Sequence, residues 1–113
     1  MAIWTILLIG FFNPLCFPAM AARLLSADQL SSLSELLPNW QLRSGKLHRQ
    51  WSFADFSEAF AFMTRVALAA EQLGHHPEWS NCWNRVTIDL VTHDLRGIST
   101  LDRDLALQIN TFI

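Results

Sequence analysis

The fold is decided by residues 53–81, FADFSEAFAFMTRVALAAEQLGHHPEWSN. Apolar side chains recur there every three or four residues, which places them on one face of an α-helix. This stripe consists of Phe56, Phe60, Met63, Ala67 and Ala70, and it is widened by Phe62, Val66 and Leu73. A helix that is apolar over so wide an arc packs against a sheet, another subunit or both, and we expect the stripe to be core rather than a cofactor site. Gly74 is placed to end the helix, because glycine readily adopts the left-handed conformation that closes many helices.

Patterns before this helix predict a further helix and a hairpin. Ser26 and Gln29 form a capping-box pair in front of a helical apolar repeat, and Pro38 ends that repeat. Apolar and polar side chains then alternate through residues 40–53, on either side of a Ser-Gly turn at residues 44–45. This alternation is typical of two antiparallel strands.

Patterns after the central helix predict one or two strands and a last helix. Residues 86–91 alternate again and predict a half-buried strand, which Gly97 interrupts. Ser99 begins the last helix, with Asp102 in the capping-box position. The stretch around Trp79 is too short to assign from periodicity. The order of elements indicates an α+β domain, with helices packed on one face of an antiparallel sheet.

Composition excludes several classes of protein. A chain of 113 residues predicts one domain, and with 51% apolar and 16% charged residues it is not disordered. A net charge of -2 and scattered basic residues argue against nucleic-acid binding. The two cysteines, Cys16 and Cys82, have no C-x-x-C spacing, so we expect neither a disulfide framework nor a cysteine zinc site. Cys82 alone suits a reducing compartment, and we expect a cytoplasmic protein.

Residues 1–20, MAIWTILLIGFFNPLCFPAM, form an apolar extension that we separate from a globular domain at residues 21–113. We favour an upstream extension with Met20 as the true start. A signal peptide with a cleavage site at residues 19–21 would make the protein exported, but no basic residue precedes the apolar run. A membrane span is interrupted by an asparagine and two prolines, and for the folded domain we expect no contact with a membrane.

The candidate site contains three of the four histidines, His75, His76 and His93. The first two follow the predicted helix in a loop that Pro77 stiffens, and His93 lies where the later strand ends. Histidine transfers protons near neutral pH. Glu71, one helical turn before His75, could hold an imidazole in one tautomer. The set therefore indicates acid/base chemistry.

Trp40 and Trp79 offer flat apolar surfaces on which an aromatic ligand could lie. Two alternatives stay open for the histidines, since adjacent loop histidines are often solvated surface and three histidines can bind zinc. Neighbouring histidines rarely share one metal, and no H-x-H or H-x-x-x-H spacing is present, so we expect no metal and no cofactor. Surface positions are expected for His48, Glu78 and Asp94, and Asp102 is expected to cap its helix first.

These residues resemble the pterin-4a-carbinolamine dehydratase family, also known as the dimerisation cofactor of hepatocyte nuclear factor. The resemblance runs from Leu24 to Phe112 and is densest in residues 53–81 and in VTIDLVTHDLRGISTLDRDLA, residues 86–106. The family motif is matched in order by Glu71, His75, His76, Pro77, Trp83, His93 and Asp102. The resemblance implies a four-stranded antiparallel sheet with helices on one face, a fourth strand around Trp79, and a homodimer or homotetramer.

The resemblance also implies an activity. The family removes water from 4a-hydroxytetrahydrobiopterin to give quinonoid dihydropterin, which recycles the pterin after aromatic amino acid hydroxylation. The resemblance would assign His75 and His93 to general acid/base catalysis at the departing hydroxyl. It would assign His76 to orienting the pterin or to serving as the alternate base.

Around the substrate we then expect Glu71, Pro77, Trp79, Trp40 and Asp102. Two rival hypotheses are a non-catalytic protein-binding or dimerisation module, suggested by the apolar central helix, and a zinc hydrolase.

Overall fold

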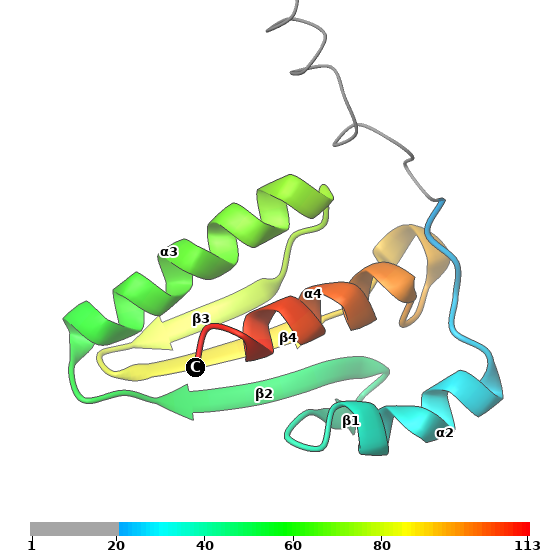
Figure 1. Cartoon of the computed structure of the whole chain (residues 1–113), viewed down its shortest axis with the longest axis horizontal. Helices are drawn as coiled ribbons and strands as arrows, with labels where there is room; N and C mark the ends of the chain where they lie inside the picture. Colours follow the sequence, from blue (N-terminus) through cyan, green and yellow to red (C-terminus); the bar gives the residue numbers. More distant parts are fainter. Residues whose placement is uncertain (1–20) are drawn as a thin grey trace, which may run out of the picture.

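The structure, a computed structural model, describes residues 21–113, which build a four-stranded antiparallel sheet with helices along it (Figure 1). The elements in chain order are α2 (Ala27–Leu36), β1 (Gln41–Arg43), β2 (Lys46–Ser52), α3 (Phe56–Leu73), β3 (Glu78–Cys82), β4 (Arg85–Leu90), the 3-10 turn η2 (His93–Leu95) and α4 (Thr100–Asn110). The strand order is β1-β2-β4-β3. The predicted α+β class is therefore confirmed, and the fourth strand that the resemblance implied is β3. Our interpretations of residues 1–20 lie outside the described residues.

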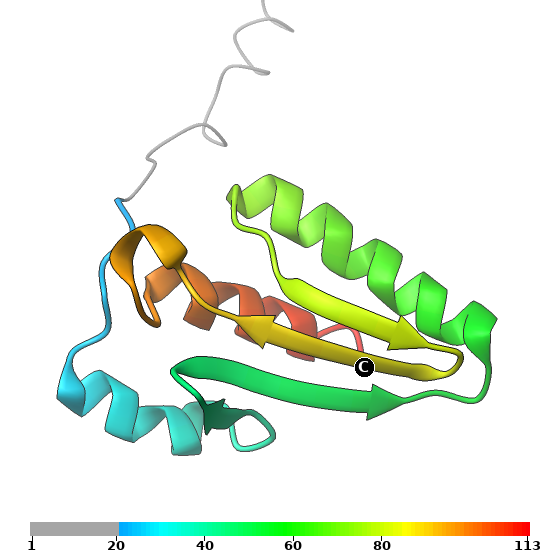
Figure 2. The ribbon, with the colours of Figure 1, turned by 180° about the vertical axis from the view of Figure 1, so that it is seen from behind.

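The register of the strands divides the sheet into a covered face and an open face. Along β4, Val86, Ile88 and Leu90 are buried while the residues between them are half-buried. Leu47 of β2 pairs with Leu90, and Trp51 pairs with Val86, so their side chains join the same core. Seen from behind, the strands lie in front of α4, which runs along the other side of the sheet (Figure 2). The face opposite the helices is thus left to polar side chains such as Lys46, His48 and Glu78.

The central helix α3 buries part of the predicted stripe, Phe62, Val66 and Ala70, and Met63 and Leu73 pack against the same core. Its buried residues are Ala59, Phe62, Val66, Ala69 and Ala70. Phe56 and Phe60 are 50% and 57% exposed, so the prediction that they are core is wrong for the single chain. The two apolar stripes adjoin on one helix, and sequence spacing does not say which of them meets the sheet. The alternative that this helix also contacts another subunit stays a prediction.

Both ends of α3 are capped, and Gly74 closes the helix as predicted. The Asp55 carboxylate accepts a hydrogen bond from the Glu58 N–H at 2.8 Å, and Gly74 closes the helix with φ 66° and ψ 29°. The His75 N–H then donates to the Ala70 carbonyl at 3.0 Å. Gly74 therefore sets the direction in which the chain leaves the helix toward the histidines. In the described part of the chain, none of the helices combines the length and apolar character needed to span a membrane.

Replacing Gly74 with alanine should destabilise the protein through backbone strain alone. A Cβ atom at this position would meet no heavy atom within 4 Å, whereas the left-handed conformation costs an alanine roughly 1–2 kcal/mol. We expect Gly74→Ala to lower the free energy of unfolding by about 1 kcal/mol, as measured by urea denaturation. An unchanged midpoint would contradict this account of the helix end.

Candidate active site

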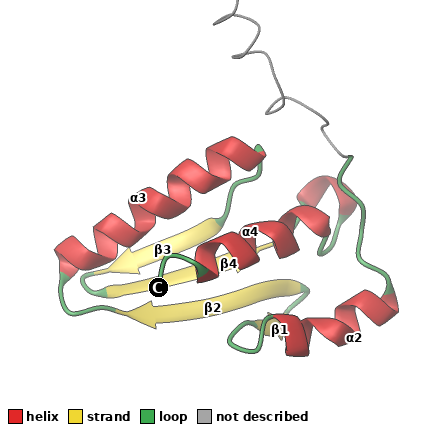
Figure 3. Ribbon diagram, in the orientation of Figure 1, coloured by secondary structure: helices red, strands yellow, loops and turns green. Residues whose placement is uncertain are grey.

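The structure brings the three predicted histidines to one pocket at the end of the sheet. Its lining comes from two segments, the loop after α3 and the chain that runs from the end of β4 into η2 (Figure 3). The pocket has a volume of about 210 Å³ and is lined by Gly74, His75, His76, Val91, Thr92, His93 and Asp94. The two segments are far apart in sequence, so the pocket exists only because the sheet and α3 bring their ends together.

The buried carboxylate of Asp102 holds the His75 ring in place. The His75 Nε2 lies 2.5 Å from Oδ1 of Asp102, and the two side chains are 11% and 0% exposed. The other oxygen of Asp102 accepts hydrogen bonds from the Ser99 N–H and the Thr92 hydroxyl, both at 2.8 Å. Asp102 caps α4 as predicted. It also orients His75, and as a wholly buried residue it reaches the pocket only through that ring.

His76 and His93 are held in the same way by more exposed carboxylates. The His76 Nε2 lies 2.7 Å from Oε1 of Glu71. The imidazole that Glu71 holds is therefore that of His76, and not that of His75, which lies one helical turn after Glu71. The His93 Nε2 lies 2.5 Å from Oε1 of Glu78. Glu78, which was expected to be a solvated charge, is 42% exposed, and it also binds Lys46 at 2.8 Å. Nothing in the sequence spacing links Glu78 to His93, since they meet only through the pairing of β3 with β4.

The three histidines share one chemical arrangement. Each uses Nε2 to contact its own carboxylate, and within residues 21–113 none makes a hydrogen bond through Nδ1. A carboxylate that is ionised can only accept, so Nε2 carries a proton. The lone pair of each neutral ring is then on Nδ1, because the partner of one ring nitrogen fixes the state of the other. The pocket is therefore lined by three rings that can take a proton at Nδ1.

Neither of the predicted tryptophans is among the residues that line the pocket. Trp40 is 6% exposed in the core, where its indole N–H donates to Oδ1 of Asn110 at 2.9 Å, and it is not among the residues that line the pocket. Trp79 lies on the edge strand β3, paired with Ile88, and is 37% exposed. Pro77 is half-buried and leads directly into β3.

The fourth histidine is not the free surface residue that we expected. The His48 side chain is 15% exposed, and its Nδ1 lies 2.6 Å from Oδ1 of Asp89 on the open face of the sheet. His48 uses the opposite ring nitrogen from the three pocket histidines. Asp94 lies at the rim of the pocket and is exposed, as predicted. In residues 21–113, no three side chains of histidine, cysteine, aspartate or glutamate are grouped as a metal site.

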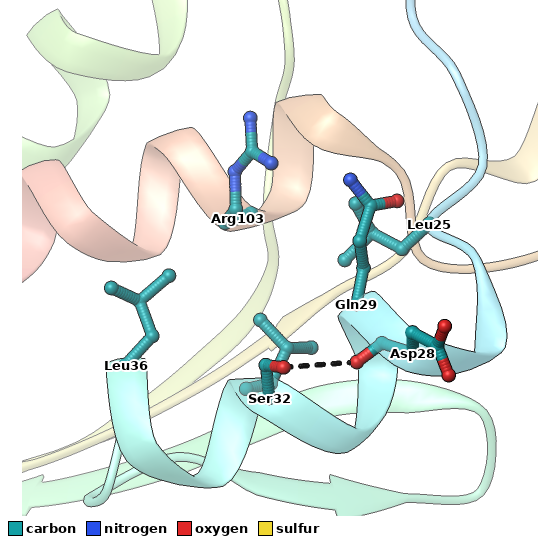
Figure 4. Close-up of a pocket in the computed structure, with 7 residues that line it drawn as sticks. Leu25, Asp28, Gln29, Ser32, Leu36 and Arg103 are labelled. Carbon is teal, nitrogen blue, oxygen red and sulfur yellow. Dashed lines mark hydrogen bonds between the residues drawn. The ribbon is translucent and has the colours of Figure 1, made fainter.

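A second hollow of about 220 Å³ lies between α2 and α4 and contains none of the predicted site residues. Figure 4 shows that Leu36, Ser32 and Gln29 line this hollow from α2 and Arg103 from α4, with the guanidinium of Arg103 directed away from α2. The Ser32 hydroxyl donates to the Asp28 carbonyl within the same helix at 3.0 Å. The Ser32 hydroxyl is therefore used within α2 itself. The histidine pocket remains the candidate site.

Comparison with known proteins identifies a family. Residues 23–112 match the family described as pterin 4 alpha carbinolamine dehydratase. A relative from Synechococcus sp. (strain WH7803), named "Putative pterin-4-alpha-carbinolamine dehydratase", is 58% identical over 89 residues, which cover 79% of this chain and 96% of the relative. A relative of the same name from Prochlorococcus marinus (strain MIT 9303) is 58% identical over 91 residues, covering 80% and 95%. A crystal structure described as transcriptional coactivator/pterin dehydratase from Brucella Melitensis matches with a TM-score of 0.74 at 40% identity, covering 79% and 97% of the two chains.

The fold and the matches together place the chain in a class of hydro-lyases. It belongs to the pterin-4a-carbinolamine dehydratase family, as the sequence motif had indicated.

Removing the Asp102 side chain should destabilise the whole domain as well as the site. Asp102→Ala leaves the Ser99 N–H, the Thr92 hydroxyl and His75 without their buried partner. Breaking a buried charged network from one side costs about 3–5 kcal/mol, and urea denaturation should show a loss of this size. Asp104→Ala, two residues along the same helix at an exposed position, is the matched control and should change stability by less than about 0.5 kcal/mol. Equal losses in the two variants would refute the role assigned to Asp102.

Proposed function

We propose that this chain removes water from 4a-hydroxytetrahydrobiopterin, or a closely related 4a-hydroxytetrahydropterin, to give the quinonoid dihydropterin. The observation that carries the proposal is the set of three histidines lining one pocket, each contacting its own carboxylate through Nε2. Family membership supports the substrate and the reaction.

The reaction needs two proton transfers, which histidines can provide. The C4a–O bond breaks and the hydroxyl leaves as water after receiving a proton, while a ring N–H of the pterin gives up a proton. A protonated imidazole supplies the first proton and a neutral imidazole takes the second at Nδ1. We assign His75 and His93 to the departing hydroxyl, and His76 to orienting the pterin or acting as the alternate base. No metal or cofactor enters this scheme.

The remaining predicted residues support these three. Glu71 and Asp102 hold His76 and His75 by direct contact, Pro77 fixes the loop, and Trp79 is near enough in sequence to flank a bound ring. Trp40, buried in the core, contributes to the site only by supporting the sheet. In the cell the reaction would recycle a tetrahydropterin after aromatic amino acid hydroxylation, and we place it in the cytoplasm.

Substitution of the pocket histidines tests the assignment directly. His75→Ala and His93→Ala should each lower kcat by up to 10²–10⁴-fold, the usual contribution of one general acid or base. The losses are measured by ultraviolet-monitored dehydration of a synthetic 4a-hydroxytetrahydropterin, after subtracting the uncatalysed rate. His48→Ala removes a histidine held by a carboxylate outside the pocket and should leave kcat unchanged. The proposal fails if neither pocket variant is slower than the His48 variant.

We also propose that the chain forms a homodimer or homotetramer through the outer face of α3. Phe56, Phe60 and Leu68 are 50%, 57% and 67% exposed, and the two phenylalanine rings lie 5.9 Å apart. Large apolar side chains that gather on the exposed side of a helix in a small domain mark an interaction site. A second copy presents the same apolar surface, so the two copies are complementary.

A charge placed in this surface should separate the copies. We expect Phe60→Glu to reduce the mass measured by sedimentation to that of one chain, because association would bury the new carboxylate. Gln72→Glu adds the same group to the same helix at an exposed polar position and should leave the mass unchanged. A wild-type protein that sediments as a monomer but binds a different protein through this face would instead support the protein-binding module.

A further inference from the structure

Glu78 bridges two basic side chains at the edge of the pocket. Its Oε2 accepts a hydrogen bond from the Lys46 ammonium at 2.8 Å, and its Oε1 contacts the His93 Nε2 at 2.5 Å. Lys46 begins β2, Glu78 begins β3 and His93 begins η2. Because β4 lies between β2 and β3 in the sheet, the bridge links the strands on either side of β4 to His93, which begins the 3-10 turn after β4.

The charges in this bridge reinforce one another. The hydrogen bond from Lys46, and then the one from His93, hold the pKa of the Glu78 carboxyl below its usual range. The hydrogen bond to Glu78 raises the pKa of Lys46. Glu78 is therefore an ionised acceptor and Lys46 a charged donor at neutral pH. Exposed ion pairs of this kind contribute little to stability. The bridge matters because it orients the Glu78 carboxylate toward His93.

We propose that Glu78 is a positioning residue for His93, and that Lys46 determines which Glu78 oxygen the histidine meets. Lys46 occupies Oε2, which leaves Oε1 to accept the Nε2–H of His93. The Nδ1 of His93 is then left to exchange a proton in the pocket. Glu78 thus does for His93 what the buried Asp102 does for His75. The consequence for turnover rests on the dehydratase function proposed above.

The substitution Glu78→Gln tests the direction of the hydrogen bond between His93 and Glu78, because it replaces one carboxylate oxygen with an NH2 group of nearly the same size. The ammonium of Lys46 can only donate, so it will hold the amide oxygen of the new side chain. The amide NH2 group then points at the His93 Nε2, which must become an acceptor, and the proton moves to Nδ1. Nitrogen-15 NMR of the ring, in alkaline buffer where imidazoles are neutral, distinguishes the two tautomers. Lys46 keeps its charge in a mildly alkaline buffer because the ordinary pKa of a lysine, about 10.4, lies well above that of an imidazole, about 6.5.

The control variants separate positioning from a general surface effect. In the double variant Lys46→Met, Glu78→Gln the amide is free to turn, and its oxygen can again accept from Nε2, so the wild-type tautomer should return. Asp89→Asn alters the carboxylate beside His48 on the same face of the sheet and should leave the His93 tautomer as in wild type. We expect Glu78→Gln to lower kcat roughly 10–100-fold, as is usual when the outer partner of a functional histidine is changed. The double variant should recover most of this loss.

Each outcome decides one of the two proposals. A His93 tautomer that is the same in Glu78→Gln as in wild type overturns the positioning role, as does an equal change in Asp89→Asn. A changed tautomer with kcat unaltered overturns the catalytic consequence. If the wild-type protein has no dehydratase activity, the proposed function fails, whereas the tautomer measurement still supports or refutes the role of Glu78.

Discussion

The pocket depends on one buried carboxylate. Asp102 is fully enclosed, and burying a charge is costly unless hydrogen bonds satisfy it. Those bonds come from the start of α4 through Ser99, from the end of β4 through Thr92, and from the loop after α3 through His75. The Thr92 hydroxyl donates to Asp102 and so accepts from Ser99 at 2.6 Å. Three segments that are separate in sequence are thereby fixed to one group, and two of them, the loop after α3 and the chain after β4, line the pocket.

The same pairing of histidine with carboxylate occurs once in a buried position and twice in exposed positions. His75 is 11% exposed against a carboxylate that is 0% exposed, whereas the side chains of His93 and Glu78 are 73% and 42% exposed and those of His76 and Glu71 are 63% and 76%. Surface ion pairs give little orientation unless further contacts hold them. Glu78 has such a contact in Lys46, while Glu71 is anchored only by its helix. The ring of His75 is therefore the most rigidly held of the three, and that of His76 is the most adjustable.

The sequence predicts what depends on local chemistry and misses what depends on register. Both capping boxes, the hairpin turn and the helix end at Gly74 are local, and all are confirmed. The strand β3 has no clear alternation because an edge strand is exposed on both faces. Trp40 was predicted to line the substrate site because the sequence alone does not distinguish an aromatic side chain in a core from one in a pocket. Glu78 was missed because it lies 15 residues from His93, and only the pairing of β3 with β4 brings the two together.

The use of Nε2 in all three pairs has an electrostatic consequence. A ring that takes a proton at Nδ1 becomes an imidazolium whose opposite nitrogen already contacts a carboxylate. The positive charge on the ring then forms beside a carboxylate that is already in place. The surrounding groups need to reorganise little, and fixed charges assist a reaction most under this condition. At His75 the carboxylate is buried and screening by water is weak, so the effect is largest there. His48, which contacts Asp89 through Nδ1, has the reverse arrangement and lies outside the pocket. The choice of ring nitrogen therefore separates the histidines of the site from the one that only stabilises the sheet.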